Sequence, residues 1–291
     1  MGILKLERII ANGKSEIGKQ KEGTFQENQD SFYISPNLLA ESEADKGKGF
    51  FIIADGLKTM GHEASQMAVG ITAEGLNKLL AQRISIGDLY KMWDIAEKAN
   101  KAIREKRKEK PVYEAMGTTL TLALIKDRDL RYVHIGDSRL YVLYSDGVFR
   151  QETRDANAVQ RDVDNRIITP EEAMADPRSS DLQHYLGKEE SLNGCSRNLI
   201  SLANEGRTVH KILLITDGIY HMVWPKDIER VVKEGDPKDI PDELIRLANN
   251  PGEDIIQLYA KILDINDPQE AKRVIGGNDN MTCIAAKLEY K

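Results

Sequence analysis

Acidic side chains stand at the ends of several predicted strands, where carboxylates could hold a hard metal ion. They are Asp30, Asp55, Asp137, Asp217 and Asp279. A single Asp at such a place is most often part of a turn, because Asp and the Gly that often follows it are turn formers. Several carboxylates gathered at one edge repel one another unless a cation neutralises them. Ligands that are all oxygen atoms favour Mg²⁺ or Mn²⁺ over Zn²⁺.

The pair Asp55-Gly56 adds a backbone atom to these side chains. Glycine lets the main chain approach a ligand closely, so the carbonyl oxygen of Gly56 could be a further ligand. Two ions about 4 Å apart could polarise a phosphoryl group and lower the pKa of a water between them. The pattern therefore predicts metal-assisted hydrolysis.

Composition and other motifs argue against several other classes of protein. The chain has 291 residues and a net charge of −6, which makes a generic nucleic-acid surface a poor prediction. No apolar run approaches the roughly 20 residues of a membrane span, and no signal peptide is evident, so we expect a cytoplasmic protein. Cys195 and Cys283 form no CxxC pair. The run from Gly13 to Lys19 resembles a phosphate loop, but Gln20 replaces the Ser or Thr that binds magnesium.

Hydrophobic periodicity predicts strands that cluster, with helices grouped between the clusters. The expected strands are 30–34, 50–54, 118–125, 130–135, 139–144, 211–216 and 281–288, and the expected helices are 63–82, 86–107, 227–234, 241–248 and 253–263. Short connections within 118–144 predict antiparallel neighbours there, and a hairpin turn is expected at 145–147. The arrangement favours an α+β fold in a single domain over 1–291. The basic end of the second helix is interpreted as a solvated helix terminus, with a docking patch for an acidic partner as the alternative.

The order and wording of the motifs resemble the bacterial form of the PPM/PP2C metal-dependent protein serine/threonine phosphatases over about residues 7–289. The motifs are Asn28-Gln29-Asp30-Ser31, Ala54-Asp55-Gly56, Gly117-Thr118-Thr119-Leu120, His134-Ile135-Gly136-Asp137-Ser138-Arg139, Ile168-Thr169-Pro170-Glu171-Glu172-Ala173, Thr216-Asp217-Gly218 and Gly276-Gly277-Asn278-Asp279-Asn280-Met281-Thr282. Together and in this order, the motifs are specific to this family, although no single motif would be.

The resemblance implies a four-layer α-β-β-α sandwich of two mainly antiparallel sheets flanked by helices, with two Mn²⁺ or Mg²⁺ ions between the sheets. Asp55 would bridge the ions, and Gly56 would bind one of them through its carbonyl oxygen. Asp217 and Asp279 would complete the ligand set. The implied reaction is hydrolysis of phosphoserine or phosphothreonine by attack of metal-bound water.

Further roles follow from the same resemblance. Asp30 would orient the attacking water, so Asp30, Asp55 and Asp217 are the expected catalytic residues. Asp137, together with Asp217, would hold a third ion. Residues 155–187 would form a flap beside the site. The partner would be a phosphorylated protein substrate, whose phosphate a Ser/Thr kinase would have added.

One departure from the family concerns the substrate phosphate. The resemblance implies an Arg five residues before Asp30, but Phe25 stands there. Lys58 is the proposed substitute, with Lys19 or Lys21 as alternatives, because an ammonium can also bind phosphate. The loss of the Arg leaves a second interpretation open, a catalytically weak module that binds a phosphorylated partner. A hydrolase of small phosphoesters is a third.

Overall fold

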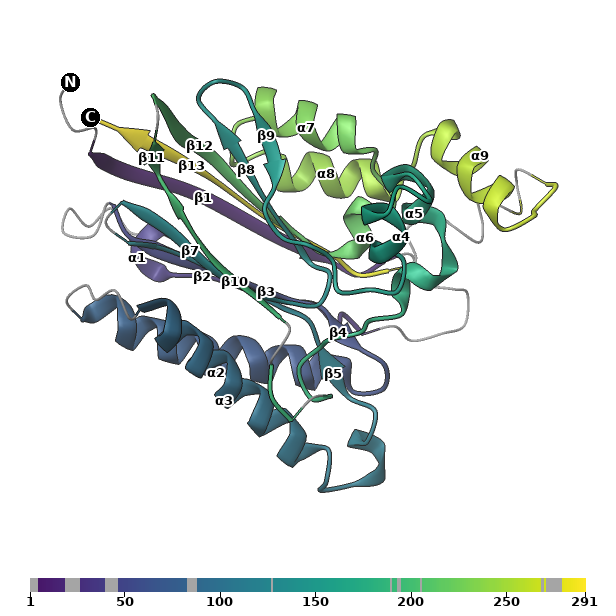
Figure 1. The fold of residues 1–291 in the computed structure, drawn as a ribbon, viewed down its shortest axis with the longest axis horizontal. Coiled ribbons are helices and arrows are strands. Elements are labelled where there is room, and N and C mark those ends of the chain that lie inside the picture. The colour runs from purple at the N-terminus through teal and green to yellow at the C-terminus, as the bar shows by residue number, and fades with distance from the viewer. Residues whose placement is uncertain are drawn as a thin grey trace.

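Two antiparallel sheets face each other between two layers of helices in the computed structural model (Figure 1). The structure describes residues 5–18, 27–39, 47–82, 88–126, 128–188, 190–192, 195–204, 206–267, 270 and 279–291. Within these ranges no helix is long and apolar enough to cross a membrane. The expected α+β sandwich is confirmed.

Each sheet draws on strands from distant parts of the chain. The first sheet contains, in spatial order, β1 (Leu6–Glu16), β13 (Met281–Tyr290), β12 (Arg207–Ile215), β8 (Arg139–Tyr144) and β9 (Phe149–Gln151), with β11 (Ala203–Asn204) also paired to β12. The second contains β10 (Ser196–Ser201), β7 (Asp129–Ile135), β6 (Leu120–Lys126), β3 (Gly49–Ala54) and β2 (Ser31–Ile34), and β4 (Gly56–Leu57) pairs with β5 (Gly117–Thr118).

Two pairs of long helices cover the outer faces of the sheets, and shorter helices lie elsewhere. The helices are α1 (Pro36–Leu39), α2 (Gly61–Ala81), α3 (Asp88–Lys106), α4 (Gln160–Asp164), α5 (Pro170–Ala175), α6 (Asp217–Tyr220), α7 (Pro225–Glu234), α8 (Ile240–Asn249) and α9 (Glu253–Ile262), with short 3₁₀ turns at Pro111–Tyr113 and Pro177–Ser180. In Figure 1, α2 and α3 lie along one sheet, and α7 and α8 lie along the other.

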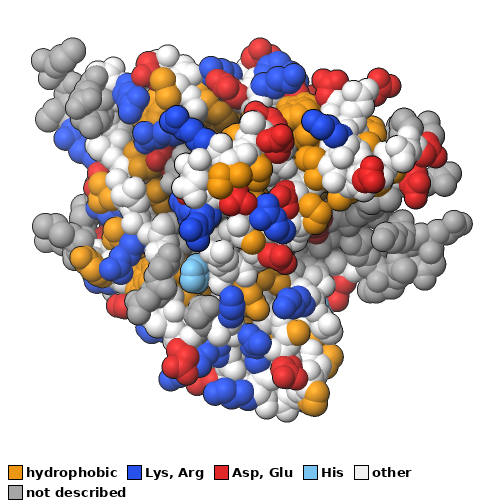
Figure 2. All heavy atoms as spheres, turned by 45° about the vertical axis from the view of Figure 1, so that its right-hand side comes forward, with side chains coloured by type: hydrophobic (Ala, Val, Ile, Leu, Met, Phe, Trp, Pro, Cys, Tyr) orange, Lys and Arg blue, Asp and Glu red, His pale blue; other side chains and the backbone are white. Residues whose placement is uncertain are grey.

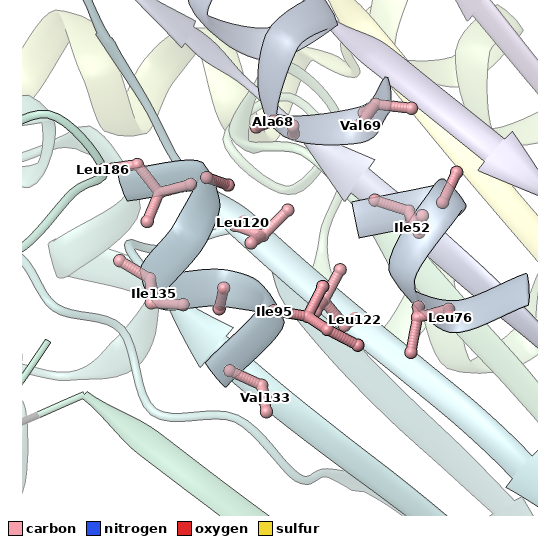
Figure 3. Close-up of a cluster of buried hydrophobic side chains, with 14 of the residues drawn as sticks. Ile52, Ala68, Val69, Leu76, Ile95, Leu120, Leu122, Val133, Ile135 and Leu186 are labelled. Atoms are coloured by element: carbon pink, nitrogen blue, oxygen red, sulfur yellow. The ribbon is translucent and has the colours of Figure 1, made fainter. Parts of the chain in front are cut away.

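The strand period of two divides the side chains of β3 between two hydrophobic cores. Phe51 and Ile53 point between the sheets, where they pack with residues of β12 and β13. Phe50 and Ile52 point the other way and pack under α2 and α3. Figure 3 shows this second core, in which Ile52 lies among side chains of both helices and of the neighbouring strands. All of these side chains are fully buried, so the sandwich presents one rigid edge to the loops that follow its strands.

The connection between β7 and β8 corrects one prediction. Residues 136–138 are a short link, and we expected the two strands to be antiparallel neighbours. They belong to different sheets, because the link crosses from one to the other. Gly136 has φ +103°, a conformation that favours glycine, and a Cβ there would come within 2.6 Å of the Thr119 side chain. The crossing places Asp137 between the sheets.

Two edge strands were not predicted at all. β1 pairs with β13 along its length and includes the run from Gly13 that resembles a phosphate loop. β10 pairs with β7 and is largely half-buried or exposed. Neither strand shows the alternation of apolar and polar residues by which a half-buried strand is recognised. The predicted hairpin turn is confirmed, since the Gly147 N–H donates to the Tyr144 carbonyl and β8 pairs with β9.

The basic end of α3 is occupied by local pairs. Arg104 lies 3.4 Å from Glu190, and Lys106 lies 2.8 Å from Glu109. The Arg107 guanidinium donates to the carbonyls of Glu114 and Gly187. Figure 2 shows acidic side chains among the basic ones over the lower part of the molecule. These contacts favour the solvated helix terminus over a docking patch.

A buried ion pair joins the two helices to the sheet beneath them. The Lys126 ammonium, at the end of β6, donates to Asp88 Oδ2 at 3.1 Å and to the Leu79 carbonyl at 3.2 Å. Asp88 is fully buried at the start of α3, and Leu79 lies in the last turn of α2. One cation therefore fixes the end of one helix, the start of the next and the end of a strand.

Breaking this pair should destabilise the fold strongly. Asp88→Ala leaves a buried ammonium without its counter-charge, and we expect the free energy of unfolding to fall by about 3–5 kcal/mol in urea denaturation. Asp88→Leu combined with Lys126→Met removes both charges and should recover most of the loss. The control is Glu74→Ala, which breaks the exposed Glu74–Lys78 pair and should leave the free energy of unfolding nearly unchanged. Equal losses for Asp88→Ala and Glu74→Ala would contradict the assignment.

Candidate metal centre

The five predicted carboxylates meet at one end of the sandwich. Asp30 precedes β2, Asp55 follows β3, Asp137 lies in the crossing between β7 and β8, Asp217 begins α6 directly after β12, and Asp279 lies just before β13. Burial raises the pKa of each of the other four, and the charge of Asp217 raises it further, so all lie within electrostatic reach of Asp217. The structure thus brings together residues up to 249 positions apart in the chain (279 minus 30).

Asp30 is held by two hydroxyl groups from the opposite sheet. Thr216 Oγ1 donates to Asp30 Oδ2 at 2.9 Å, and Thr282 Oγ1 lies 2.7 Å from the same oxygen. The second oxygen, Asp30 Oδ1, is buried without a hydrogen-bond partner. Burial and the charge of Asp217 raise the pKa of Asp30 to about 7, although the two hydroxyls oppose the shift. One oxygen is therefore fixed while the other is left free.

The backbone around Asp55 is fixed by the start of the neighbouring strand. The Asp55 N–H donates to Thr119 Oγ1 at 2.9 Å. Its carbonyl accepts from Thr118 Oγ1 at 2.8 Å and from the Thr119 N–H at 2.9 Å. Both threonines are fully buried. Burial, followed by the charges of Asp217 and Asp30, raises the pKa of the Asp55 carboxyl well above its usual range.

Close backbone approaches require glycine beside two of the carboxylates. A Cβ on Gly56 would lie 2.3 Å from the Gly61 carbonyl oxygen and 2.5 Å from that of Gln29. A Cβ on Gly218 would lie 2.2 Å from the Asn280 carbonyl oxygen. No side chain fits at these distances, so both glycines let the loops of the site pack directly on one another.

Asn280 connects the last loop of the site to the first. Its Oδ1 accepts from the Gln29 N–H at 2.8 Å, and its own N–H donates to Asp279 Oδ1 at 2.8 Å. Asp279 keeps an accessible surface, while the protein atoms around its carboxyl and the charges of Asp217 and Asp30 raise its pKa well above the usual range. Asn280 thus supports the last loop.

Asp137 and Arg139 lie on the same crossing but play different parts. Burial and the charge of Asp217 raise the pKa of Asp137 well above its usual range, against the lowering effect of Arg139. The Arg139 guanidinium forms hydrogen bonds of 2.7–3.2 Å with the buried Asp155 carboxylate and stacks 3.6 Å from the centre of the Tyr220 ring. It is therefore an internal residue that anchors the start of the flap-like segment.

Both ends of that segment, residues 155–187, are attached to the strands beside the site. At its start, the Ala156 N–H donates to the Gly136 carbonyl at 2.9 Å. At its end, Leu186 exchanges hydrogen bonds with Thr118. Between these points, α5 begins with a capping box formed by Thr169 and Glu172. The segment is thus a structured insertion whose two ends are hydrogen-bonded beside the site.

Of the lysines proposed to bind the substrate phosphate, the structure describes Lys58. Phe25, Lys19, Lys21 and the motif at 276–278 lie outside the described residues. Lys58 is exposed, with φ +61°, and its carbonyl accepts from Gln29 Nε2 at 3.1 Å. His62 Nδ1 lies 3.0 Å from Glu27, which gives this helix-start histidine a local partner.

The chemistry of the acidic side chains fits a hard divalent cation. Asp30 Oδ1 and Asp217 Oδ1 are buried oxygen atoms without hydrogen-bond partners, and the neighbouring carboxyls have raised pKa values. Such a cluster gains most from a cation that neutralises it. Within the described ranges, no three His, Cys, Asp or Glu side chains already stand at metal-ligand geometry. The donor types therefore fit, whereas the ligand positions are not preformed.

A pocket of about 260 Å³ lies beside the carboxylates and was not predicted from the sequence. It is lined by Met174, Ala175, Asp176, Pro177, Ser179, Ser180, Gly218, His221, Met222, Tyr259, Leu263 and Asp279. These residues come from the flap-like segment, from the region of α6 and from the region of α9. The amphipathic pattern of 253–263 predicted that helix, but nothing in the pattern indicated that it would contact the flap.

The chain is similar to bacterial phosphatases in sequence and structure. The family model described as Protein phosphatase 2C matches residues 17–255. The serine/threonine protein phosphatase PstP of Mycobacterium tuberculosis is 32% identical over 262 residues, covering 88% of this chain and 47% of that protein. The chain thus spans about half the length of this relative. The protein phosphatase PhpP of Streptococcus pneumoniae is 28% identical over 210 residues, covering 71% of this chain and 82% of that protein.

Solved structures show the same likeness. A crystal structure of Mycobacterium tuberculosis PstP has a TM-score of 0.70 at 28% identity, covering 97% of this chain and 99% of that one. The catalytic domain of PstP in complex with two manganese ions has a TM-score of 0.69 at 27% identity, covering 98% and 99%. In that protein, therefore, the same fold holds two manganese ions.

Without metal, the carboxylate cluster should weaken the fold. Asp217→Asn removes a charge that, together with burial, raises the pKa of the other four, and we expect it to raise the melting temperature of the protein in EDTA. Thermal unfolding measures this effect. The control is Asp94→Asn on the exposed side of α3, which should change the melting temperature little. A lower melting temperature for Asp217→Asn than for the parent protein would show that the cluster is not under electrostatic strain.

Proposed function

The chain belongs to the protein phosphatase 2C family, and from this premise we propose that it is a metal-dependent protein serine/threonine phosphatase. The observation that carries the proposal is the meeting of the carboxylates around Asp217, with buried oxygen atoms left without hydrogen-bond partners. The relatives, one named a serine/threonine protein phosphatase and the other a protein phosphatase, imply phosphoprotein substrates. A Ser/Thr kinase would add the phosphate that this protein removes. We propose that both enzymes act in the cytoplasm.

The proposed ligand set follows the predicted one. Asp55, the Gly56 carbonyl, Asp217 and Asp279 would hold two Mn²⁺ or Mg²⁺ ions, and Asp137 with Asp217 would hold a third. When bound, such ions neutralise the phosphate charge and lower the pKa of water. The raised pKa of Asp55, Asp137 and Asp279 supports this set, because each of these carboxyls gains from a nearby cation.

Asp30 is proposed to act on the attacking water. Thr216 and Thr282 engage Oδ2 and thereby fix the plane of the carboxyl group. The free Oδ1 could then accept a hydrogen bond from the water and orient it toward phosphorus. The proposed catalytic residues are therefore Asp30, Asp55 and Asp217, each carried by a different strand end.

We further propose that residues 1–291 act as one catalytic domain, in which 155–187 form a flap over the site. The attachment of both ends of this segment beside Asp55 and Asp137 supports its place next to the chemistry. No observation favours the alternative of a weak module that only binds a phosphorylated partner.

The function is tested first through the bridging carboxylate. With Mn²⁺, we expect turnover of p-nitrophenyl phosphate and of a phosphothreonine peptide, and EDTA should abolish both. Asp55→Asn should lower kcat by about a thousandfold or more, because it removes a principal electrostatic element. The exposed Asp94→Asn serves as the matched control. A loss of tenfold or less would mean that the bridging role is misassigned, and binding without turnover would favour the non-catalytic module.

Lys58 is proposed to attract the substrate phosphate. We expect Lys58→Ala to raise KM for the phosphothreonine peptide about tenfold, the effect of losing roughly 1.4 kcal/mol of charge attraction, with a smaller change in kcat. Steady-state kinetics with Mn²⁺ measure both constants. Lys78→Ala, which removes an exposed lysine of α2, is the control. Unchanged KM and kcat for Lys58→Ala would exclude a role for this residue.

A further inference from the structure

Helix α9 lies at the end of the part of the chain that the family model matches. The match ends at residue 255, within α9, whereas the last strand begins only at Met281. In Figure 1, α9 lies beside α5 at the end of the molecule and away from both sheets. Its apolar side packs on the flap-like segment, since Ile255, Ile256 and Tyr259 form a small core with Ala175.

Tyr259 fastens α9 to both neighbouring walls of the pocket described above. Its hydroxyl donates to the Met174 carbonyl at 2.7 Å and lies 3.2 Å from the His221 carbonyl. Met174 belongs to α5, and His221 directly follows α6. One buried side chain thus fixes the three elements that surround the pocket, so the pocket does not need to be assembled when a ligand binds.

The lining of the pocket indicates the kind of group that it would accept. Met174, Ala175, Met222, Tyr259 and Leu263 give it an apolar wall, beside which stand the polar residues Asp176, Ser179, Ser180, His221 and Asp279. Its volume of about 260 Å³ is several times the roughly 30 Å³ share of one water molecule and has room for an aliphatic side chain. An apolar group that enters such a pocket gains the free energy of leaving water.

The position of the pocket indicates which molecule would carry that group. Gly218 and Asp279 line it, and both belong to the loops of the candidate metal centre. A group bound there therefore lies next to the place where the phosphoryl group would react. In a phosphoprotein substrate, a residue close in sequence to the phosphorylated one could enter the pocket while the phosphate lies at the metal centre.

We propose that this pocket binds an apolar side chain of the phosphoprotein substrate, near the phosphoserine or phosphothreonine in sequence, and that α9 thereby sets the sequence preference. The proposal rests on the proposed function, because it assumes that the phosphorylated residue reacts at the carboxylate cluster. Leu263 ends α9 and lines the pocket without belonging to the metal centre, which makes it the residue to test.

The experiment compares phosphothreonine peptides that carry one Leu at successive positions on either side of the phosphorylated residue, in a background of Gly and Ser. With Mn²⁺, we expect one position to raise kcat/KM about tenfold over the Leu-free peptide. Leu263→Arg should abolish this preference and leave turnover of p-nitrophenyl phosphate unchanged, because that ester carries no neighbouring amino-acid side chain for the pocket to select.

Two further variants separate a pocket effect from a folding effect. Leu258→Arg makes the same change on α9 at a residue outside the pocket lining, so the Leu preference should persist. Leu263→Trp keeps the wall apolar but narrows the pocket, and it should shift the preference from Leu to Ala. Thermal unfolding of each variant shows whether it remains folded.

The outcomes distinguish this proposal from the proposed function. Turnover of all peptides at equal rates, or a Leu preference that survives in Leu263→Arg, would overturn the pocket assignment and leave the phosphatase assignment standing. If the parent protein turns over neither the ester nor the peptides, the phosphatase assignment fails. Fluorescence anisotropy with the same peptides then decides the pocket: selective binding that is lost in Leu263→Arg supports it, and equal binding overturns it.

Discussion

Mutual repulsion among buried carboxylates is the constraint on which the rest of the site depends. Asp30, Asp55, Asp137 and Asp279 each feel the charge of Asp217, and burial adds to the cost of ionising them. Left to themselves, such side chains would separate or turn toward water. They stay together because each sits at the end of a strand whose other residues lie in the packed interior, and the energy of that interior far exceeds the repulsion.

Hydroxyl groups transmit this rigidity from the sheets to the acids. Thr119 fixes the backbone of Asp55, while Thr216 and Thr282 hold one oxygen of Asp30. The threonines are buried and come from three different strand ends. A hydroxyl suits this task because it satisfies a carboxylate or an amide without adding a charge to the cluster. The scaffold therefore orients the acids but leaves their negative charge uncompensated, which is the condition that favours a divalent cation.

The sequence could predict the members of the cluster, since an acid directly before or after a short apolar run is visible in the order of residues. It also predicted the helices α2 and α3, whose long apolar faces repeat at the helical period. The crossing at Gly136 was beyond such reasoning, because a short link between two strands looks the same whether it joins neighbours or changes sheets. The edge strand β1 was missed because one open edge and partial burial remove the alternation that identifies a strand.

The pocket beside α9 could not be predicted from the sequence for a related reason. Periodicity shows that a helix has an apolar face but not which surface covers it, and the partner of Tyr259 lies 85 residues away at Met174. Because of the location of this helix, the residues that hold the acids differ from those that would contact the rest of the substrate chain. The strand ends fix the acids and tolerate little change, because buried groups and close backbone contacts surround them. Helix α9 packs on α5 and on the residues that follow α6, and it carries none of the acids, so it can vary without moving them. A change there would alter which chain can lie beside the cluster and leave the chemistry of the cluster as it is.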